Sequence, residues 1–448
     1  MLIISIAHTL KLCLLISVLL LSAITPGYAA TDENNNSSKL LPETLTLTDA
    51  LSIAELHGSP ERDIAEAEIL ESSAELASVE SRYGFRVKAE AFPRYVYAID
   101  SSKGEDINDS FYALSTNKIL SDFGRTEKLS QAAEADVRAD AIRFVSFRYR
   151  RRLLIIQAYL NVLLADQRYA VENEKMTISY LRYDKIRERH GLGEISDVDL
   201  LAKESAYREE LLTRMRSANR QSEARAELGA LLNRPDDFPA ELQPIVARGD
   251  KVELEEYQGL LSKALTQNPE LSAQDERVKA ARARLEHSQM SRRPVLDSLV
   301  ELGNYKRRYG DGGKWRVGVN LVIPIREGGR FKAEIAKKRA ELQKEEARYH
   351  LMKNALRKTI LELVQELEVL KAAVKSANVR LEYRDMSLDR SRSAYELEIQ
   401  TNLGDAAANM TDAQWNADKV KYDLLLTLGN LDALLGIDPA KRFLELVK

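Results

Sequence analysis

One long pattern occurs twice in the chain, and this duplication constrains the fold more than any other feature. A Gly-Arg pair at 124–125 precedes about 65 residues with no glycine or proline, and the arrangement begins again at 329–330. The same offset of 205 residues relates Ser196 to Thr401 at the far ends. At about 1.5 Å per residue, each stretch predicts a helix roughly 100 Å long. Each stretch then turns and continues as a second helix, so two long helical hairpins are expected.

The composition favours long helices over several globular domains. Of the 448 residues, 30% are charged and 6% aromatic, a profile typical of extended helices and coiled coils. The net charge of −3 gives no sign of a nucleic-acid partner.

The N-terminus resembles a secretory signal. Residues 1–29 contain a single basic residue, Lys11, an apolar run at 12–21 and small residues at the cleavage positions. An uncleaved anchor is the alternative, although the apolar run is short for a membrane span. Residues 30–44 are polar and predict a flexible lead-in. Cys13, the one cysteine, lies in this signal, so no disulfide or cysteine site is expected after cleavage.

Between the helices the apolar period changes from 3.6 to 2, which predicts strands. In the clearest one, Trp315, Val317, Val319 and Leu321 alternate with polar residues or glycine, giving one apolar and one polar face. Four strands are expected, at 86–99, 111–120, 295–304 and 314–325.

The repeat divides the chain into similar halves. Each half is expected to contain a short helical region with a Ser/Asn-Pro-Glu break, two strands, and a long helical hairpin. The predicted units are a first repeat at 45–232, a linker at 233–254, a second repeat at 255–436 and a tail at 437–448.

The strand number bears on where the sheet can lie. Four strands cannot close a membrane barrel, since about eight is the minimum, and lipid does not tolerate open edges. In a membrane, several chains would therefore complete one barrel, with Tyr95, Tyr97 and Trp315 as interfacial aromatics. The alternative is a small soluble β-sandwich capping a helical stalk. The signal peptide and the two long helices favour the membrane.

Several motifs occur in order and at matching spacing. They are Ser-Pro-Glu and Asn-Pro-Glu at 59–61 and 268–270, IPIREGGR at 323–330, GLGEISDV at 191–198, and LGALLN and LDALLG at 228–233 and 431–436. With the duplicated halves, they make the whole mature chain resemble the TolC-like outer membrane efflux proteins, the outer membrane factors.

The resemblance implies a mainly α fold with a β-barrel part. A homotrimer would form a twelve-stranded barrel in the outer membrane of a Gram-negative bacterium, continued by an α-helical tunnel across the periplasm. The implied partners are outer membrane lipid, a periplasmic adaptor and an inner-membrane pump, either proton-driven or of the ABC type. The protein would be a passive duct without cofactor or metal. Both efflux and type I protein secretion remain open.

The first hairpin tip, residues 190–199, resembles the family's adaptor-docking pattern at Gly191, Leu192, Ser196 and Asp197. Glycine allows a tight turn, and Leu192 offers an exposed apolar contact. The simpler interpretation is structural, because Ser196 has the character of a helix N-cap, with Asp197 in the first turn beside the positive helix end.

The second tip, residues 398–405, is where the family places its periplasmic gate, an acidic ring with a basic latch. The matching acidic positions are Gly404 and Ala407 and the matching basic position is Gln400, so this chain departs from that pattern. Polar bonds around the constriction are instead expected from the following candidates: Asp197, Asp199, Tyr395, Gln400 and Asp405.

No enzymatic constellation is present in the sequence. The five histidines lack metal-ligand spacing, and the glycine-rich run at 310–314 lies between expected strands rather than before a helix, unlike a phosphate loop. The basic run at 148–152 is expected to be a helix face paired with nearby acids, although a cationic tunnel lining is possible. The alternative function is a periplasmic coiled-coil adaptor or scaffold, which usually has one hairpin between halves of small β-domains; this chain has two tips.

Overall fold

The computed structural model describes residues 42–56, 58–97, 106–108, 110–237, 241–246, 255–305, 314–397 and 402–446. The expected signal peptide at 1–29, most of the lead-in at 30–44, and Gln400 lie outside these residues. Within the described part the chain is mainly helical and carries a small four-stranded sheet, which confirms the predicted mainly α class with a β part.

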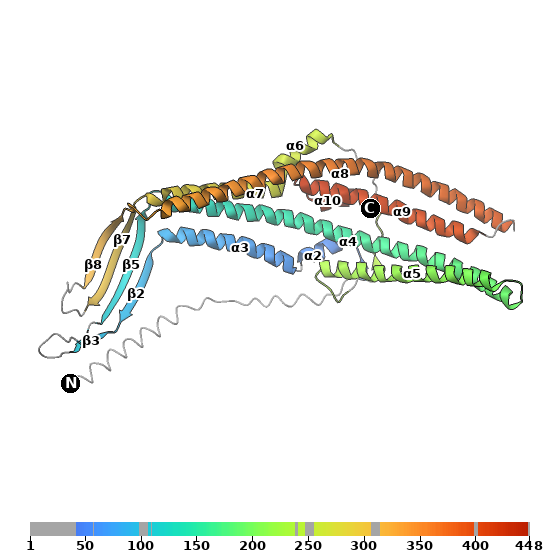
Figure 1. Ribbon diagram of the computed structural model, residues 1–448, viewed down its shortest axis with the longest axis horizontal. Helices are drawn as coiled ribbons and strands as arrows, with labels where there is room; N and C mark the ends of the chain where they lie inside the picture. The colour runs from blue at the N-terminus through green and yellow to red at the C-terminus, as the bar shows by residue number, and fades with distance from the viewer. Residues whose placement is uncertain are drawn as a thin grey trace. The chain divides into compact units, whose positions relative to one another are not determined.

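Two long hairpins dominate the molecule (Figure 1). Their outgoing helices, α4 (Arg125–Gly191) and α8 (Arg330–Glu396), contain 67 residues each. The returning helices are α5 (Asp197–Leu231) and α9 (Leu403–Leu434). The equal lengths of α4 and α8 match the constant offset of the sequence repeat.

Each long helix begins at a glycine with a left-handed backbone. Gly124 has a φ of 84° and Gly329 a φ of 94°, a region in which a side chain would strain the turn. In the first half, the Asp122 carboxylate then accepts hydrogen bonds from the amides of Arg125 (3.1 Å) and Thr126 (2.7 Å). These bonds satisfy open donors at the helix start. The Gly-Arg pairs in the sequence therefore mark the joints between strand and helix.

Shorter helices precede the strands in each half. They are α2 (Leu47–Leu56) and α3 (Pro60–Glu80) in the first, and α6 (Tyr257–Gln267) and α7 (Pro269–Gln289) in the second. The Ser59 hydroxyl accepts from the Arg62 amide (3.2 Å), and the Asn268 side chain accepts from the Leu271 amide (2.8 Å). Proline at the first helical position removes no needed donor. Both proline breaks are thus capped helix starts.

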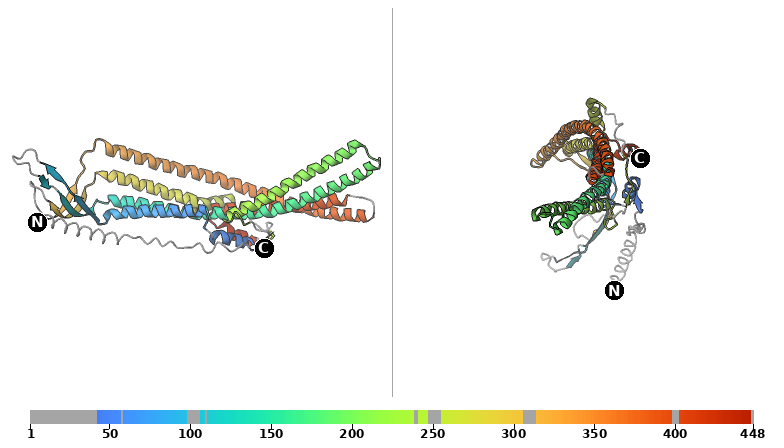
Figure 2. Two further views of the ribbon diagram at one scale, coloured as in Figure 1. Left: turned by 90° about the horizontal axis from the view of Figure 1, so that it is seen from below. Right: turned by 90° about the vertical axis from the view of Figure 1, so that its right-hand side faces the viewer.

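The helices lie side by side in one layer (Figures 1 and 2). On the sheet side of the molecule the order is α3-α4-α7-α8, and toward the hairpin tips it is α5-α4-α9-α8. None of the helices in the described ranges is long and apolar enough to cross a membrane.

The best-buried region lies where α4 packs against α9. Fully buried side chains here include Ile155, Ile156, Leu160, Leu424, Leu425 and Leu428. Gly429 allows this approach, because a Cβ at that position would come within 2.7 Å of the Leu153 side chain. Burial of these large apolar groups stabilises the crossing of the two hairpins.

Short elements surround this crossing. Strands β1 (Thr44–Leu45) and β6 (Glu241–Leu242) pair in parallel, and helix α10 (Pro439–Leu446) packs on α9 and α4. The Tyr159 hydroxyl donates to the Gln243 carbonyl at 2.8 Å, with the Leu45 carbonyl 2.9 Å from the same oxygen. The segment expected as a linker therefore contains strand β6, and the segment expected as a tail contains helix α10.

The four-stranded sheet is antiparallel, in the order β2-β5-β7-β8. Its strands are β2 (Arg86–Phe92), β5 (Phe111–Ser121), β7 (Val295–Tyr305) and β8 (Trp315–Val322). The halves of the repeat meet at β5 and β7, where Leu114 pairs with Leu302. Strands β2 and β8 are consequently the open edges.

Two expected strands end earlier than the sequence pattern indicates. The strand expected at 86–99 stops at Phe92, and Tyr95–Tyr97 forms a separate strand, β3, paired with β4 (Asp106–Asn108). The strand expected at 314–325 stops at Val322. Pro93 and Pro324 lie just beyond these ends, and proline has no amide hydrogen to donate to a ladder.

Candidate functional site

One face of the sheet is more apolar than the other near its outer end. Directly paired residues share a face, and successive residues alternate between faces. One face carries the rows Ala89–Leu114–Leu302–Trp315 and Val87–Thr116–Val300–Val317. The opposite face carries the row Lys88–Ser115–Glu301–Arg316. The same sheet can therefore contact an apolar medium on one side and water on the other.

The apolar face is uncovered in a single copy. Trp315 is 68% exposed, and Val87, Leu114, Leu302 and Val317 are exposed beside it. Contiguous exposed apolar surface of this kind marks a membrane or protein contact. Of the three expected interfacial aromatics, Trp315 lies on this sheet, whereas Tyr95 and Tyr97 lie in β3 of the separate hairpin.

The tip of the first hairpin presents apolar side chains on a bonded turn. Leu192 is 76% exposed and Val198 is 75% exposed. The Ser196 hydroxyl accepts from the Asp199 amide at 3.2 Å, so Ser196 is the N-cap of α5, as expected. His190 Nε2 lies 2.7 Å from an Asp197 carboxylate oxygen. Sequence reasoning missed His190 and Val198, although Val198 lies in the same tip motif as Leu192.

The glycine requirement at this turn differs from the sequence-based expectation. Gly193 has a φ of +75°, whereas Gly191 ends α4 without a positive φ, and a Cβ on Gly191 would meet nothing within 4 Å. Gly193 is thus the residue that allows the tight turn, because a left-handed φ strains other residues. The expectation that Gly191 has this role is wrong.

The second tip is linked to the first hairpin by an ion pair. Asp405, in the first turn of α9, pairs with Arg182 of α4. The other described gate candidates do not bridge the hairpins. Asp197 bonds His190, Asp199 bonds Ser196, and the exposed Tyr395 side chain makes no hydrogen bond to any residue in the described ranges. The structure therefore singles out Asp405 and adds Arg182, which no sequence motif indicated.

Above this pair, polar contacts between α4 and α9 continue. Arg168 Nη1 lies 2.9 Å from the Asp412 carboxylate, and the Trp415 indole donates to the Leu164 carbonyl at 3.0 Å. The Arg168 guanidinium also lies over the Trp415 ring, 4.7 Å from its centre, a favourable cation–π geometry. The hairpins are held together by several bonds near mid-length and by Asp405 at the tip.

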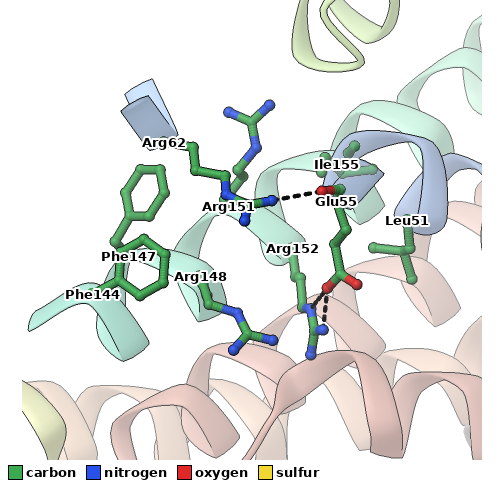
Figure 3. A pocket seen from close by; sticks show the side chains of 10 residues that line it. Leu51, Glu55, Arg62, Phe144, Phe147, Arg148, Arg151, Arg152 and Ile155 are labelled. Atoms are coloured by element: carbon green, nitrogen blue, oxygen red, sulfur yellow. Dashed lines mark hydrogen bonds and ion pairs between the residues drawn. The ribbon is translucent and has the colours of Figure 1, made fainter. Parts of the chain in front are cut away.

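The basic run on α4 joins several short helices (Figure 3). Arg151 pairs with Glu61 of α3 at 3.1 Å, and Arg152 pairs with Glu55 of α2 and Asp438 beside α10. Arg150 pairs with Glu270 of α7. The expected pairing with nearby acids is present for these three arginines. They fasten surrounding elements to α4, next to a cavity of about 360 Å³.

A buried carboxyl lies at the end of α9. Asp432 is 0% exposed, and its nearest opposite charge is Arg442 of α10, 3.1 Å away. Burial raises the pKa of Asp432 to about 6, and the arginine offsets only part of that effect. This carboxyl therefore holds its proton more readily than an exposed aspartate.

The described residues hold no group of histidine, cysteine and acidic side chains suited to a metal ion. The arrangement provides an apolar sheet face, a charged sheet face, and two different hairpin tips. These features suit contact with lipid, water and protein surfaces.

Comparisons with known proteins agree with this geometry. Residues 260–437 match the family model described as outer membrane efflux protein. No curated protein sequence matches the chain.

Solved structures match nearly the whole chain. The Campylobacter jejuni CmeC outer membrane channel has a TM-score of 0.72 at 14% identity, covering 89% of this chain and 88% of its own. A Pseudomonas aeruginosa membrane protein has a TM-score of 0.71 at 17% identity, covering 87% of this chain and 93% of its own. The open state of the Neisseria gonorrhoeae MtrE outer membrane channel has a TM-score of 0.68 at 18% identity, covering 88% of this chain and 89% of its own.

The family match falls on the second half, and the first half repeats the same elements in the same order. The structural matches extend that fold over both halves. Residues 260–437 thus match the outer membrane efflux protein family, and both halves together have the fold of the solved outer membrane channels.

Proposed function

We propose that three copies of this chain form a passive exit duct through the outer membrane and the periplasm. The observation that carries this proposal is the sheet, which has an exposed apolar face, a charged opposite face and two open edges. Lipid tolerates a sheet only when every edge is paired. Neighbouring copies would pair β2 with β8 and so close a barrel of twelve strands.

The helical layer would continue the duct. In each copy two hairpins extend from the sheet side toward their tips, and three copies would place six hairpins around one passage (Figure 1). Residues 1–29 would direct export and be removed, and residues 30–44 would lead into the folded part. The repeats at 45–232 and 255–436 would act as matched halves of the wall.

The first tip would dock a periplasmic adaptor. Exposed apolar side chains at a ring of tips give a protein partner something to bury. Leu192 and Val198 supply this surface, while Gly193, Ser196 and Asp197 fix the turn that presents it. The adaptor would connect the duct to an inner-membrane pump that supplies the energy.

The second tip would provide the gate. The Arg182–Asp405 pair ties the two hairpins of one copy together at their ends. Breaking such a tie would free one hairpin to move outward and widen the passage. Both side chains are about half exposed, so the pair is weak enough to open when a partner binds.

Efflux of small molecules is the cargo class that the family description favours. Type I protein secretion would use the same duct. A stand-alone adaptor or scaffold is disfavoured, because both hairpins and the sheet belong to one fold that matches outer membrane channels across most of the chain.

Brominated lipid tests the membrane assignment. The chain has two tryptophans, so Trp415→Phe leaves Trp315 as a single probe and Trp315→Phe leaves Trp415. In vesicles of brominated phosphatidylcholine, Trp315 fluorescence should be quenched strongly and Trp415 fluorescence should not. Equal, weak quenching of both would refute the duct.

A further inference from the structure

The helical layer has two uncovered edges on the sheet side. In the order α3-α4-α7-α8, the described part of the chain places a long helix against α3 on its α4 side and against α8 on its α7 side, and the short helix α6 also contacts α8 (Figure 2). Large apolar residues are exposed on both edges, with Ile64 at 63% and Leu351 at 70%. Small residues accompany them: Ala67 and Ala74 on α3, and Ala336, Ala340 and Ala347 on α8. Such surfaces allow another helix to approach closely.

Helix α3 is strongly acidic. It contains seven acidic residues and one arginine, a net charge of −6. Glu61 and Glu66 are paired with Arg151 and Arg62. The remaining acids form no ion pair within the described part of the chain and are exposed: Asp63, Glu68, Glu71, Glu75 and Glu80. Glu68, Glu71 and Glu75 also line a groove of the same chain that contains Arg143, Arg277 and Arg284. These three arginines are already paired with Asp140 or Asp136.

The facing stretch of α8 has the opposite charge. Residues 330–358 contain ten basic and four acidic residues, a net charge of +6. Five of the basic residues are exposed and form no ion pair with the residues that the structure describes: Lys332, Lys337, Arg339, Lys344 and Arg357. The two edges therefore balance each other in both total charge and number of unpaired groups.

The charged stretches also lie at corresponding positions along the layer. The Arg151–Glu61 pair places the start of α3 beside residue 151 of α4. By the 205-residue offset, residue 151 corresponds to Leu356 of α8, the end of the basic stretch. From these points α3 runs to β2, and the basic stretch of α8 runs back to β8. Both stretches thus cover the portion of the layer nearest the sheet.

Toward the tips the edges lack this complementarity. Helix α5 contains seven acidic and six basic residues, and so does α8 over 359–396. Both are rich in exposed apolar side chains, including Leu201 and Met215 on α5 and Val369 and Met386 on α8. The opposed charges are confined to the sheet side.

We infer that the acidic edge of α3 docks against the basic edge of α8 in a second copy of this chain, and that these charges specify which edges meet. The inference rests on the proposed duct, since a closed ring needs a head-to-tail contact repeated at every seam. Residues that flank a small-residue ridge and carry opposite charges set the partner and orientation of packed helices. Like edges would repel, so only a head-to-tail ring is favoured.

Charge reversal tests this seam. The acid-reversed variant carries Glu68→Lys, Glu71→Lys and Glu75→Lys, and the base-reversed variant carries Lys337→Glu, Arg339→Glu and Lys344→Glu. In detergent at about 0.05 M NaCl, where charges are weakly screened, each variant should lose most of its trimer, as measured by light scattering after gel filtration. The chain with all six changes should recover it. A matched control with Glu209→Lys, Glu223→Lys and Glu227→Lys on α5 should remain trimeric.

Self-sorting provides the sharper result. When the wild type and the six-change chain are co-expressed with different tags, affinity capture of one should recover almost none of the other. Mixed trimers in statistical proportion would overturn the inference while leaving the duct intact. Trimers that survive reversal but lose efflux would likewise overturn it and assign these charges to another partner. A wild-type chain that is monomeric in lipid would instead refute the proposed duct itself.

Discussion

The two halves of the chain share one plan but differ at the ends of their hairpins. Helices α4 and α8 have equal length and begin at equivalent left-handed glycines. At the far ends, the first tip has a side-chain N-cap and exposed apolar residues. In the second, Asn402 precedes α9 without a side-chain cap bond, and Asp405 pairs with Arg182.

A further difference lies where the returning helices end. The buried Gly229 of the first half corresponds by sequence motif to the buried Asp432 of the second. The two halves therefore share the scaffold, whereas a few short segments differ in their contacts. The variants below test how far this separation extends, beginning with the largest expected effect.

Replacing Arg182 with alanine should produce the largest change. Loss of its bond to Asp405 should raise the single-channel conductance in planar bilayers severalfold, because the hairpins are no longer tied at the tip. The double variant Arg182→Asp, Asp405→Arg should restore low conductance. Arg187→Ala is the control, since Arg187 pairs with Asp184 within α4. If Arg187→Ala opened the channel equally, the tie at Asp405 would have no special role.

An aspartate at Leu192 should abolish most adaptor-dependent efflux. A charge at this position prevents burial of the first tip in a partner, while folding is unaffected because the side chain is exposed. Drug susceptibility of cells carrying Leu192→Asp is the readout. Leu397→Asp changes an exposed leucine at the other tip and should leave resistance near the wild-type level. Equal losses would show that both tips dock the adaptor.

Replacing Asp432 with asparagine should alter the pH dependence of stability. Because the folded pKa is raised to about 6, the native protein favours the protonated carboxyl. Wild-type stability is therefore greatest below about pH 4 for this group and declines as the pH rises through about 6. The Asp432→Asn variant lacks that slope and should gain up to about 3 kcal/mol per copy at pH 8. Thermal unfolding followed by circular dichroism between about pH 4 and 8 measures the effect, with the decline expected below about pH 6 and a level region above it. If the Asp432→Asn variant kept the wild-type pH dependence of stability, other titrating groups would be responsible for it.

The N-cap variants should give the smallest effect. Ser196→Ala removes a side-chain bond to the α5 amides and should cost about 1 kcal/mol locally, or about fivefold faster amide exchange in the first turn. Asn402→Ala should change exchange in α9 very little, because Asn402 makes no cap bond there. Similar acceleration in both helices would indicate that the two tips are equivalent.

Most of the scaffold could be predicted because it follows from local sequence. Helices as long as α4 and α8 follow from the absence of glycine and proline, and alternation identified the strand that contains Trp315. The strand ends at Phe92 and Val322 were harder to predict, since apolar alternation continues past the prolines that interrupt pairing. Helix α10 lies in what was expected to be a tail, because packing against α9 and α4 stabilises a segment of only 8 residues.

The tip contacts could be predicted only in part. Ser196 was recognisable because an N-cap is a local signal that spans a few residues. The Arg182–Asp405 pair joins residues 223 positions apart, and no pattern in the chain shows that they meet. The roles of Gly191 and Gly193 could not be distinguished either, because both satisfy a turn motif and only the backbone angle separates them.

The matched lengths of α4 and α8 limit how this protein can evolve. An insertion in one rod displaces its turn along the axis and rotates every residue beyond it by about 100°, which misaligns the pair at Arg182. The other long helix would need an insertion of the same size before the two hairpin tips lay at the same height along the axis again. Natural variants that differ in rod length should accordingly carry paired changes of the same size, placed 205 residues apart in the numbering of this chain.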